Sequence, residues 1–287
     1  MIGILGSGFG LYGYLPAICQ YYPDKSIFLS YKAKLILNAR SELHNYQKNI
    51  IWKESYEDII QSSEVLIISY PPFETKKLIK LITSSSKIKK IIVEKPICET
   101  PENALFFLNQ MKKANIKIAS SFIFIYTEWF DFLKNSDIDI KIHWQIVNKN
   151  QKNSWKWNPE LGGGLLSFYG IHLISLCAYF NFKVKKIIKN DLNNFEAIFK
   201  KKNREILIKI NYSNSETFFK INNSFSEETP FGKQKSLETE DFRVSFINDL
   251  LNDFEKDNND LEKLARKTIL LWKSIDSADI SLIQSNN

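Results

Sequence analysis

Two segments of the sequence contain residue types that could move a proton during a reaction. One is the tripeptide EKP at 94–96, which places Lys95 at the end of an aliphatic run, and the other is GGGLLSFYGIHLISL at 162–176, which contains His172. A lysine ammonium stabilises a developing alkoxide, and an imidazole with a pKa of about 6.5 exchanges a proton near neutral pH. Lys95 and His172 are therefore candidate functional residues.

The surroundings of His172 leave its role open. In the helix predicted here, the residues four before and three after His172 share its face, and they are Phe168 and Ser175 rather than acids. The imidazole is either a catalytic or substrate-binding group that works without a carboxylate, or a histidine of the core, and we favour the first interpretation. The three glycines before the helix also have two interpretations, a tight connection or a place where a ligand approaches the backbone.

A glycine-rich turn directly follows the first predicted strand. A dinucleotide-binding fold needs glycines here for a tight turn and for close approach of the backbone to a pyrophosphate at a helix N-terminus. The predicted cofactor contacts in this turn are Gly6, Ser7, Gly8, Phe9 and Gly10. The third glycine of the pattern would fall at position 11, where this chain has Leu11. We therefore expect Gly10 to relieve the crowding that the third glycine usually relieves. The alternative phase, with Gly13 as its last glycine, begins too late after the strand.

The end of the second predicted strand bears on the choice of cofactor. NAD sites usually place an acid there to hold the ribose 2′-hydroxyl, and this chain has Ser30, Tyr31 and Lys32 instead. A hydroxyl and a cation suit a 2′-phosphate, and Tyr31 could cover the adenine. NADP is therefore the preferred cofactor, with NAD as the alternative. The competing interpretation is that Tyr31 and Lys32 only begin a solvated helix.

The first part of the chain has the pattern of an α/β domain. Short aliphatic runs alternate with amphipathic segments, which predicts buried parallel strands joined by helices. The runs lie at 1–5, 26–31, 64–69, 90–94 and 116–120. Residues 1–120 are therefore predicted to form a Rossmann domain with a doubly wound parallel sheet.

After residue 137 the pattern changes to longer, partly alternating runs. They lie at 137–147, 182–190, 193–201, 204–213 and 216–224. Alternation of this kind predicts an open, mainly antiparallel sheet with one wet face, in an α+β domain over 121–287. Two segments with helical spacing, 240–257 and 260–278, follow this sheet, and we expect them to pack back on the body of the protein.

Composition excludes several classes of protein. With 44% hydrophobic and 25% charged residues, the 287-residue chain is typical of a soluble globular protein. Its net charge of +7 is spread over many lysines, which disfavours nucleic-acid binding. The sequence has neither a membrane-length apolar run nor a basic leader, so we expect a cytoplasmic protein that does not bind membranes. Cys19, Cys98 and Cys177 lack paired spacing, so neither a disulfide nor a metal site is expected.

Taken in order, the glycine turn, the EKP tripeptide and WNPELGGGLLSFYGIH at 157–172 resemble the glucose-fructose oxidoreductase and inositol dehydrogenase (Gfo/Idh/MocA) superfamily. The segment IISYPPFET at 67–75 resembles the strand end and cofactor-contacting proline loop of that family. The resemblance implies nicotinamide-dependent hydride transfer at a carbinol or carbonyl carbon of a sugar, nucleotide sugar or polyol, with Lys95 and His172 as catalytic residues. The further cofactor contacts that it implies are Tyr70, Pro71, Pro72, Glu94, Lys95 and Pro96.

Near His172 the chain departs from the family pattern, because two positions that are often acidic in the family are not acidic here. The family very often has Asp where this chain has Phe168, and another acid is common at the position of Ser175. A degenerate, nucleotide- or sugar-binding member with a regulatory role is therefore the alternative to an enzyme. The predicted substrate contacts are Trp155, Lys156, Trp157, Phe168, Tyr169 and His172. Family members commonly associate through the outer face of the second sheet, so a homo-oligomer, specifically a homodimer, is also expected.

Overall fold

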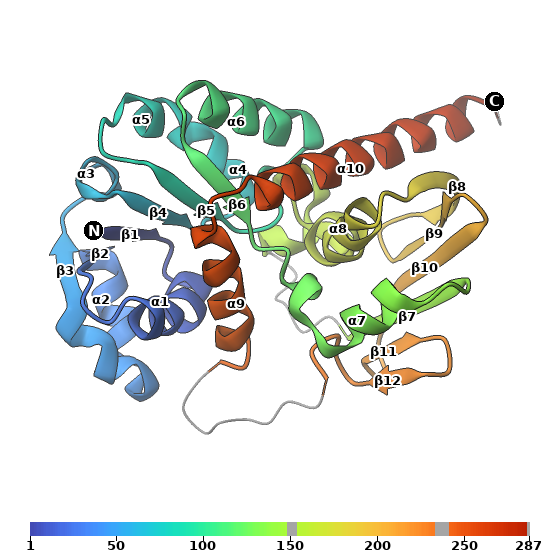
Figure 1. Ribbon diagram of the computed structural model, residues 1–287, viewed down its shortest axis with the longest axis horizontal. Coiled ribbons are helices and arrows are strands. Elements are labelled where there is room, and N and C mark those ends of the chain that lie inside the picture. The colour runs from blue at the N-terminus through green and yellow to red at the C-terminus, as the bar shows by residue number, and fades with distance from the viewer. Residues whose placement is uncertain (148–153, 233–240, 286–287) are drawn as a thin grey trace. The chain divides into compact units, whose positions relative to one another are not determined.

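A computed structural model describes residues 1–147, 154–232 and 241–285, which fold as two compact units (Figure 1). The first unit consists of Met1–Cys98, Phe106–Ser121 and Lys235–Glu262, and the second of Glu99–Leu105, Phe122–Gln234 and Lys263–Asn287. Each unit has its own six-stranded sheet.

The sheet of the first unit is wholly parallel, in the order β3-β2-β1-β4-β5-β6. Its strands are β1 (Ile2–Leu5), β2 (Ile27–Ser30), β3 (Ile50–Lys53), β4 (Val65–Ile68), β5 (Lys90–Val93) and β6 (Lys117–Ser120). Five of these confirm the predicted aliphatic runs, and their central residues are buried because helices cover both faces. This order is that of dinucleotide-binding folds, so the ends of β1 and β4 meet at the topological switch point.

Strand β3 was not predicted from the sequence. It lies at the edge of the sheet, where one side lacks a neighbour, and its residues IIWK are only half-buried. A partly exposed edge strand does not need the unbroken aliphatic run by which the inner strands were found. The sequence pattern therefore did not distinguish β3 from the helical segments on either side.

Helices connect the parallel strands and cover both faces of the sheet (Figure 1). They are α1 (Leu15–Tyr21), α2 (Tyr31–Asn38), α3 (Tyr56–Ser62), α4 (Pro72–Thr75), α5 (Ile79–Ser84) and α6 (Pro101–Lys113), of which α6 begins in the second unit. Helix α9 (Val244–Glu255) returns from far along the chain to pack on α1. Its Glu255 carboxylate accepts hydrogen bonds from Tyr22 and from Lys90, both at 2.5 Å.

The second sheet is mixed, in the order β12-β11-β7-β10-β9-β8. Its strands are β7 (Ile140–Val147), β8 (Lys183–Asn190), β9 (Asn194–Lys201), β10 (Arg204–Ser213), β11 (Phe218–Ile221) and β12 (Phe225–Glu227). Among the described strands of this second sheet, only β7 and β10 pair in parallel, so the prediction of a mainly antiparallel sheet is confirmed. The helices of this unit are α7 (Glu128–Asn135), α8 (Ile171–Tyr179) and most of α10 (Asp260–Ser285).

Alternation along the strands gives the second sheet a dry face and a wet face. On β7, for example, Ile140, Ile142 and Trp144 are buried, whereas Lys141 between them is exposed. The wet face is largely polar. For example, Lys209 of β10 lies between Glu196 of β9 and His143 of β7. Apolar side chains on this face include the cross-strand pair Leu207 and Ile198, which are half-buried. None of the helices in the described parts of the chain has the length and apolar character required to cross a membrane.

Candidate functional site

The glycine turn, which we define as Gly6–Gly10, links β1 to a π-helical turn at Gly10–Tyr14 and then to α1. Gly6 has a φ of +118°, and a Cβ there would stand 2.4 Å from the carbonyl oxygen of Ser69, so only glycine fits. Gly8 is exposed, and a Cβ built on it would meet nothing within 4 Å. The backbone at Gly8 is therefore accessible to a ligand, and Gly6 provides the turn directly after the strand, as the preferred phase requires.

The crowding in this turn is relieved at two positions. A Cβ on Gly10 would approach a methyl carbon of Ile4 to 3.1 Å, next to the fully buried Leu11. The tighter position is Gly13, where a Cβ would stand 2.2 Å from the ring of Phe9. Gly13 is thus a packing glycine that makes room for Phe9. Sequence reasoning had considered Gly13 only as part of the alternative phase.

Arg243, which precedes α9, braces the glycine turn and was not predicted to do so. Its guanidinium carbon lies 4.2 Å from the centroid of the Phe9 ring and 5.6 Å from that of Tyr12. Both carboxylate oxygens of Asp241 accept hydrogen bonds from Arg243, at 2.9 and 2.8 Å. Burial opposes the charge of Arg243, but hydrogen bonds to Asp241 outweigh it and raise the pKa of the guanidinium. The Asp-Phe-Arg sequence at 241–243 was the only available signal, and it becomes informative only once α9 is placed on α1.

The end of β2 runs directly into α2, so Tyr31 and Lys32 do begin a helix. The Tyr31 ring is exposed and stacks on Trp52 of β3, with centroids 6.2 Å apart and an interplanar angle of 27°. The Lys34 ammonium lies 5.8 and 5.7 Å from the two ring centroids. The structure thus forms an exposed aromatic platform with a cation beside it, next to Ser30 at the carboxyl end of the strand.

The turn that carries Lys95 is fixed by hydrogen bonds to its neighbour Glu94. One oxygen of the Glu94 carboxylate accepts from the hydroxyl of Tyr14 at 2.8 Å and from that of Ser121 at 2.6 Å. Burial and the adjacent negative charge of Glu94 raise the pKa of Tyr14 well above its usual value. Lys95 is half-buried, and the peptide bond between Lys95 and Pro96 is cis. Glu94 therefore holds together the ends of β5 and β6 and the start of α1.

The proline loop lies beside the glycine turn. Ser69, the residue after β4, donates its backbone N–H to the carbonyl of Leu5 at 2.7 Å and crowds Gly6. Tyr70 and Pro71 follow and are half-buried, and Pro72 begins α4 with its side chain buried. The predicted cofactor contacts from the ends of β1 and β4 are thus brought to one edge of the sheet, as the order of the strands requires.

In the second unit, His172 lies in α8 and is 5% exposed. Its ring stacks on Phe124, with centroids 4.3 Å apart and an interplanar angle of 8°. Ser175 does not replace the missing acid, because its hydroxyl donates to the backbone carbonyl of His172 at 2.6 Å. The preceding turn, Leu165–Gly170, is π-helical, a rare form that occurs frequently at functional sites.

The three glycines before this turn serve the chain's own packing. Gly162 and Gly164 have positive φ values, of +83° and +85°. A Cβ on Gly163 would stand 2.1 Å from the carbonyl oxygen of Trp155 and 2.5 Å from the carbonyl carbon of Lys156. The close approach that this glycine permits is therefore made by the WKW turn at 155–157. Of the two interpretations, the structure supports the tight connection.

The other predicted substrate contacts form an aromatic cluster within the second unit. Phe168 lies edge-on to Trp155 and Tyr169, at centroid distances of 5.6 and 4.8 Å, and the Lys156 ammonium is 5.4 Å from its ring centroid. Trp157 packs on Tyr212 of β10 at 5.2 Å. Every ring of this set is half-buried. Such a surface suits the face of a sugar ring, and it equally well secures the connection before α8.

The predicted site residues thus fall into two groups, one in each unit. The first unit brings together the glycine turn, the proline loop, the ends of β2 and β3, and the turn of Lys95. The second unit brings the WKW turn, Phe168, Tyr169 and His172 together. Within the part of the chain that the structure describes, no group of three or more His, Cys, Asp or Glu side chains could hold a metal ion.

Neither a protein-family model nor a curated protein sequence matches the chain. Solved structures do match it, over nearly its whole length. A dehydrogenase (MviM) from Clostridium difficile has a TM-score of 0.65 at 18% identity and covers 96% of this chain and 98% of its own. KijD10, a 3-ketoreductase from Actinomadura kijaniata in complex with NADP, has a TM-score of 0.65 at 11% identity and covers 94% and 95%.

A super-repressor mutant of Gal80p from Saccharomyces cerevisiae has a TM-score of 0.73 at 11% identity, over 99% of this chain and 96% of its own. At such low identity these likenesses concern the fold, and the fold is the one that the motifs predicted. The chain therefore has the fold of the Gfo/Idh/MocA type of NAD(P)-binding oxidoreductases.

Proposed function

We propose that the protein is an NAD(P)-dependent oxidoreductase that transfers a hydride between nicotinamide and a carbinol or carbonyl carbon of a sugar, nucleotide sugar or polyol. The observation that carries the proposal is the glycine turn, in which an obligatory left-handed Gly6 directly follows β1 and precedes an open backbone at Gly8. This open backbone lies directly after the first strand of the sheet, where a dinucleotide-binding fold brings the pyrophosphate to the backbone.

The residues of the first unit fit a dinucleotide. The open backbone at Gly8 suits a pyrophosphate, and the exposed ring of Tyr31 suits an adenine face. Ser30 and Lys32 lie beside that ring, where a hydroxyl and a cation favour the 2′-phosphate of NADP over the diol of NAD. When bound, the cofactor would supply the hydride acceptor or donor.

The chemistry required of the protein's own residues is proton transfer and charge stabilisation at the substrate oxygen. Lys95 would donate a hydrogen bond to that oxygen and favour its alkoxide form, because its turn is held by the hydrogen bonds to Glu94. His172 would exchange the hydroxyl proton, and its stacking on Phe124 fixes the plane of the imidazole. The aromatic side chains of the WKW turn and Phe168 would contact the carbohydrate.

Titration with NADPH and with NADH, with tryptophan fluorescence as the readout, tests the nucleotide part of the proposal. Binding of NADPH in preference to NADH is expected. If neither nucleotide bound, the proposed oxidoreductase activity would be ruled out. A screen of nucleotide sugars and polyols in the presence of the bound nucleotide, with absorbance of the reduced nicotinamide as readout, then tests the reaction itself.

A regulatory, catalytically degenerate protein is the second candidate function. It is favoured by the side chains at 168 and 175, since neither Phe168 nor Ser175 can orient an imidazole as a carboxylate does, and by the likeness to a repressor, Gal80p. Such a protein would show no turnover even as wild type. Its nucleotide affinity would stay nearly unchanged in Lys95→Met and His172→Ala.

A homodimer stays a prediction. The outer face of the second sheet is mostly polar, with Lys209 between Glu196 and His143, so an interface there would be formed largely by polar contacts around Leu207 and Ile198. Light scattering at micromolar concentration is the direct test, and a strictly monomeric mass would contradict the prediction.

A further inference from the structure

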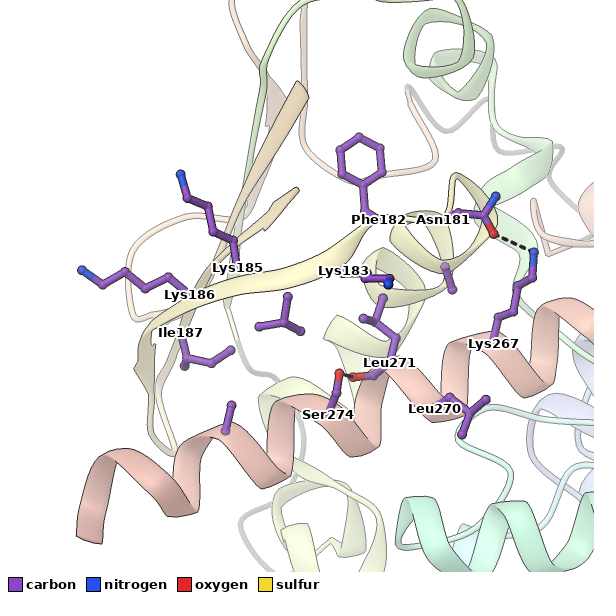
Figure 2. A pocket seen from close by; sticks show the side chains of 13 residues that line it. Asn181, Phe182, Lys183, Lys185, Lys186, Ile187, Lys267, Leu270, Leu271 and Ser274 are labelled. Atoms are coloured by element: carbon purple, nitrogen blue, oxygen red, sulfur yellow. Dashed lines mark hydrogen bonds between the residues drawn. The ribbon is translucent and has the colours of Figure 1, made fainter. Parts of the chain in front are cut away.

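A groove in the second unit is lined by none of the residues of the proposed active site. It runs between the edge strand β8 and helix α10 and has a volume of about 720 Å³ (Figure 2). The residues that line it are Ala178, Asn181, Phe182, Lys183, Val184, Lys185, Lys186, Ile187, Lys267, Leu270, Leu271, Ser274 and Ala278. The proposed function uses none of them.

The floor of the groove is apolar. Ile187 points from β8 toward α10 in Figure 2, and it is buried together with Leu271 of that helix. Leu270, one residue earlier in α10, has 51% of its surface exposed at one end of the groove. The next turns of the same helix carry Ser274 and Ala278, whose side chains are too small to fill the space between α10 and β8. The hollow thus results from small residues on a stripe of α10 that is otherwise apolar.

The rim of the groove is cationic. Lysines 183, 185, 186 and 267 contribute to its lining, and among the lining residues that the structure describes none is acidic. Lys267 is oriented by Asn181, whose side-chain oxygen accepts a hydrogen bond at 2.7 Å (Figure 2). Lys185 is paired with Glu205 at 2.5 Å, outside the lining, and extends away from α10. Lys183 and Lys267 are therefore the cations best placed at the rim to meet a bound anion.

An edge strand often carries lysines only to prevent strand-to-strand aggregation. The register of β8 is interrupted between Val184 and Lys186 and again between Ile187 and Lys189, and bulges of this kind also protect an edge. Protection of the edge explains the charges, but it does not explain an apolar hollow of this size beside them. We propose that the groove binds a small amphipathic anion, with its apolar body on the floor and its carboxylate or phosphate beside Lys183 and Lys267.

The test uses the whole protein and decanoate as the probe, below its micelle concentration, with displacement of 1-anilinonaphthalene-8-sulfonate fluorescence as readout. Decanol and decyltrimethylammonium have the same chain with a neutral or a cationic head. Decanoate is expected to bind at least about tenfold more tightly than either, because only its head group is complementary to the rim. Equal displacement by decanol would overturn the proposal, and so would no displacement by decanoate.

Two variants locate the site. The double substitution Lys183→Glu/Lys267→Glu should weaken decanoate binding by about tenfold or more, and Ser274→Trp should fill the hollow and abolish binding. The matched control Lys112→Glu/Lys113→Glu makes the same change of charge on exposed residues of α6 in place of the groove. Equal weakening by the control would show that overall charge, and not the groove, attracts the probe. If Ser274→Trp fails to fold, as judged by circular dichroism, the exposed lysine pair still decides the matter.

Two further measurements separate other occupants. Binding to vesicles of phosphatidylglycerol without binding of monomeric decanoate would indicate a membrane surface and overturn the proposal. A mass that falls from dimer to monomer in Ser274→Trp would assign the groove to a second copy of the chain, and would likewise overturn it. NADPH titration of the same variants should be unchanged, so failure here is distinguishable from failure of the proposed oxidoreductase function.

Discussion

The two units position their candidate functional residues by different kinds of interaction. In the first unit, directional bonds do so: Glu94 accepts from Tyr14 and Ser121 beside Lys95, and Asp241 holds Arg243 against the glycine turn. In the second unit, aromatic packing does so, with Phe124 stacked on His172 and a set of half-buried rings around Phe168. Hydrogen bonds fix distances and angles, whereas packing of rings fixes shape and tolerates different ligands.

This difference agrees with the different tasks that the proposed function gives to the two units. The proposed function assigns the nucleotide to the first unit, where hydrogen bonds hold the geometry constant, and the substrate to the second unit, where packed rings can accept different shapes. The replacement of the family's acids by Phe168 and Ser175 falls entirely in the second unit. Chemistry that depends on fixed charge should therefore depend more on Lys95 than on any residue near His172.

The largest expected effect concerns Lys95. If the proposed role of Lys95 holds, Lys95→Met should lower turnover by about 10² to 10⁴-fold, because it would remove the charge that stabilises the substrate oxygen. Phe168→Ala should mainly change the Michaelis constant through substrate fit. Single-turnover kinetics with the substrate found in the screen measure both. Turnover that survives Lys95→Met and His172→Ala alike would mean that the chemistry belongs to other residues.

The same substitution, glycine to alanine, should have opposite effects on stability and on nucleotide binding at Gly163 and at Gly8. Gly163→Ala should lower the free energy of unfolding by about 3 kcal/mol, because the new methyl would stand 2.1 Å from the carbonyl oxygen of Trp155. Gly8→Ala should leave stability unchanged within about 0.5 kcal/mol, yet weaken NADPH binding about tenfold by filling the space at the turn. Urea unfolding and NADPH titration of both variants are the measurements. A stable Gly163→Ala, or unaltered NADPH binding in Gly8→Ala, would contradict the assigned roles.

Lys32 tests the choice between the two nicotinamide cofactors. Lys32→Ala should weaken NADPH by about 1 to 2 kcal/mol through loss of a charge-assisted contact and leave NADH nearly unaffected. Lys34→Ala, one turn into the same helix and beside the Tyr31 and Trp52 rings, serves as the comparison. Equal weakening of both nucleotides by Lys32→Ala would show that the lysine does not meet a 2′-phosphate.

The smallest expected effect concerns the hydrogen bond from Tyr14 to Glu94. Tyr14→Phe should lower the free energy of unfolding by about 1 kcal/mol at pH 7. Because the folded pKa of Tyr14 lies well above that of an unfolded tyrosine, about 10, its contribution is full below pH 10 and decreases as the pH rises above it. The difference between wild type and variant should therefore shrink above pH 10.

Urea unfolding between pH 7 and 11 checks this dependence. Tyr179→Phe, at an exposed tyrosine of α8, is the control and should show no such change. A difference between wild type and Tyr14→Phe that grows above pH 10 would show that Glu94 does not hold the tyrosine in its protonated form.

The sequence by itself determined the architecture and the main positions of the first unit. Five of its six strands were predicted from aliphatic runs, because a parallel sheet covered on both faces requires them, and the glycine turn was placed from its spacing after β1. The second sheet was predicted, as mainly antiparallel, from alternation, which a sheet with one wet face requires. Lys95 and His172 were named from local motifs, and each lies on the element that the motif predicted, the end of β5 and helix α8.

Only the tertiary structure decided which residues support these positions. Arg243 contacts a turn more than two hundred residues earlier, and Ser121 shares Glu94 with Tyr14 of the π-helical turn before α1. No local pattern predicts contacts across such separations. The role of Gly163 became visible only when the WKW turn was seen against it. Periodicity records which face of an element is buried, whereas hydrogen-bond partners and close approaches depend on elements that the fold, and not the neighbouring sequence, brings together.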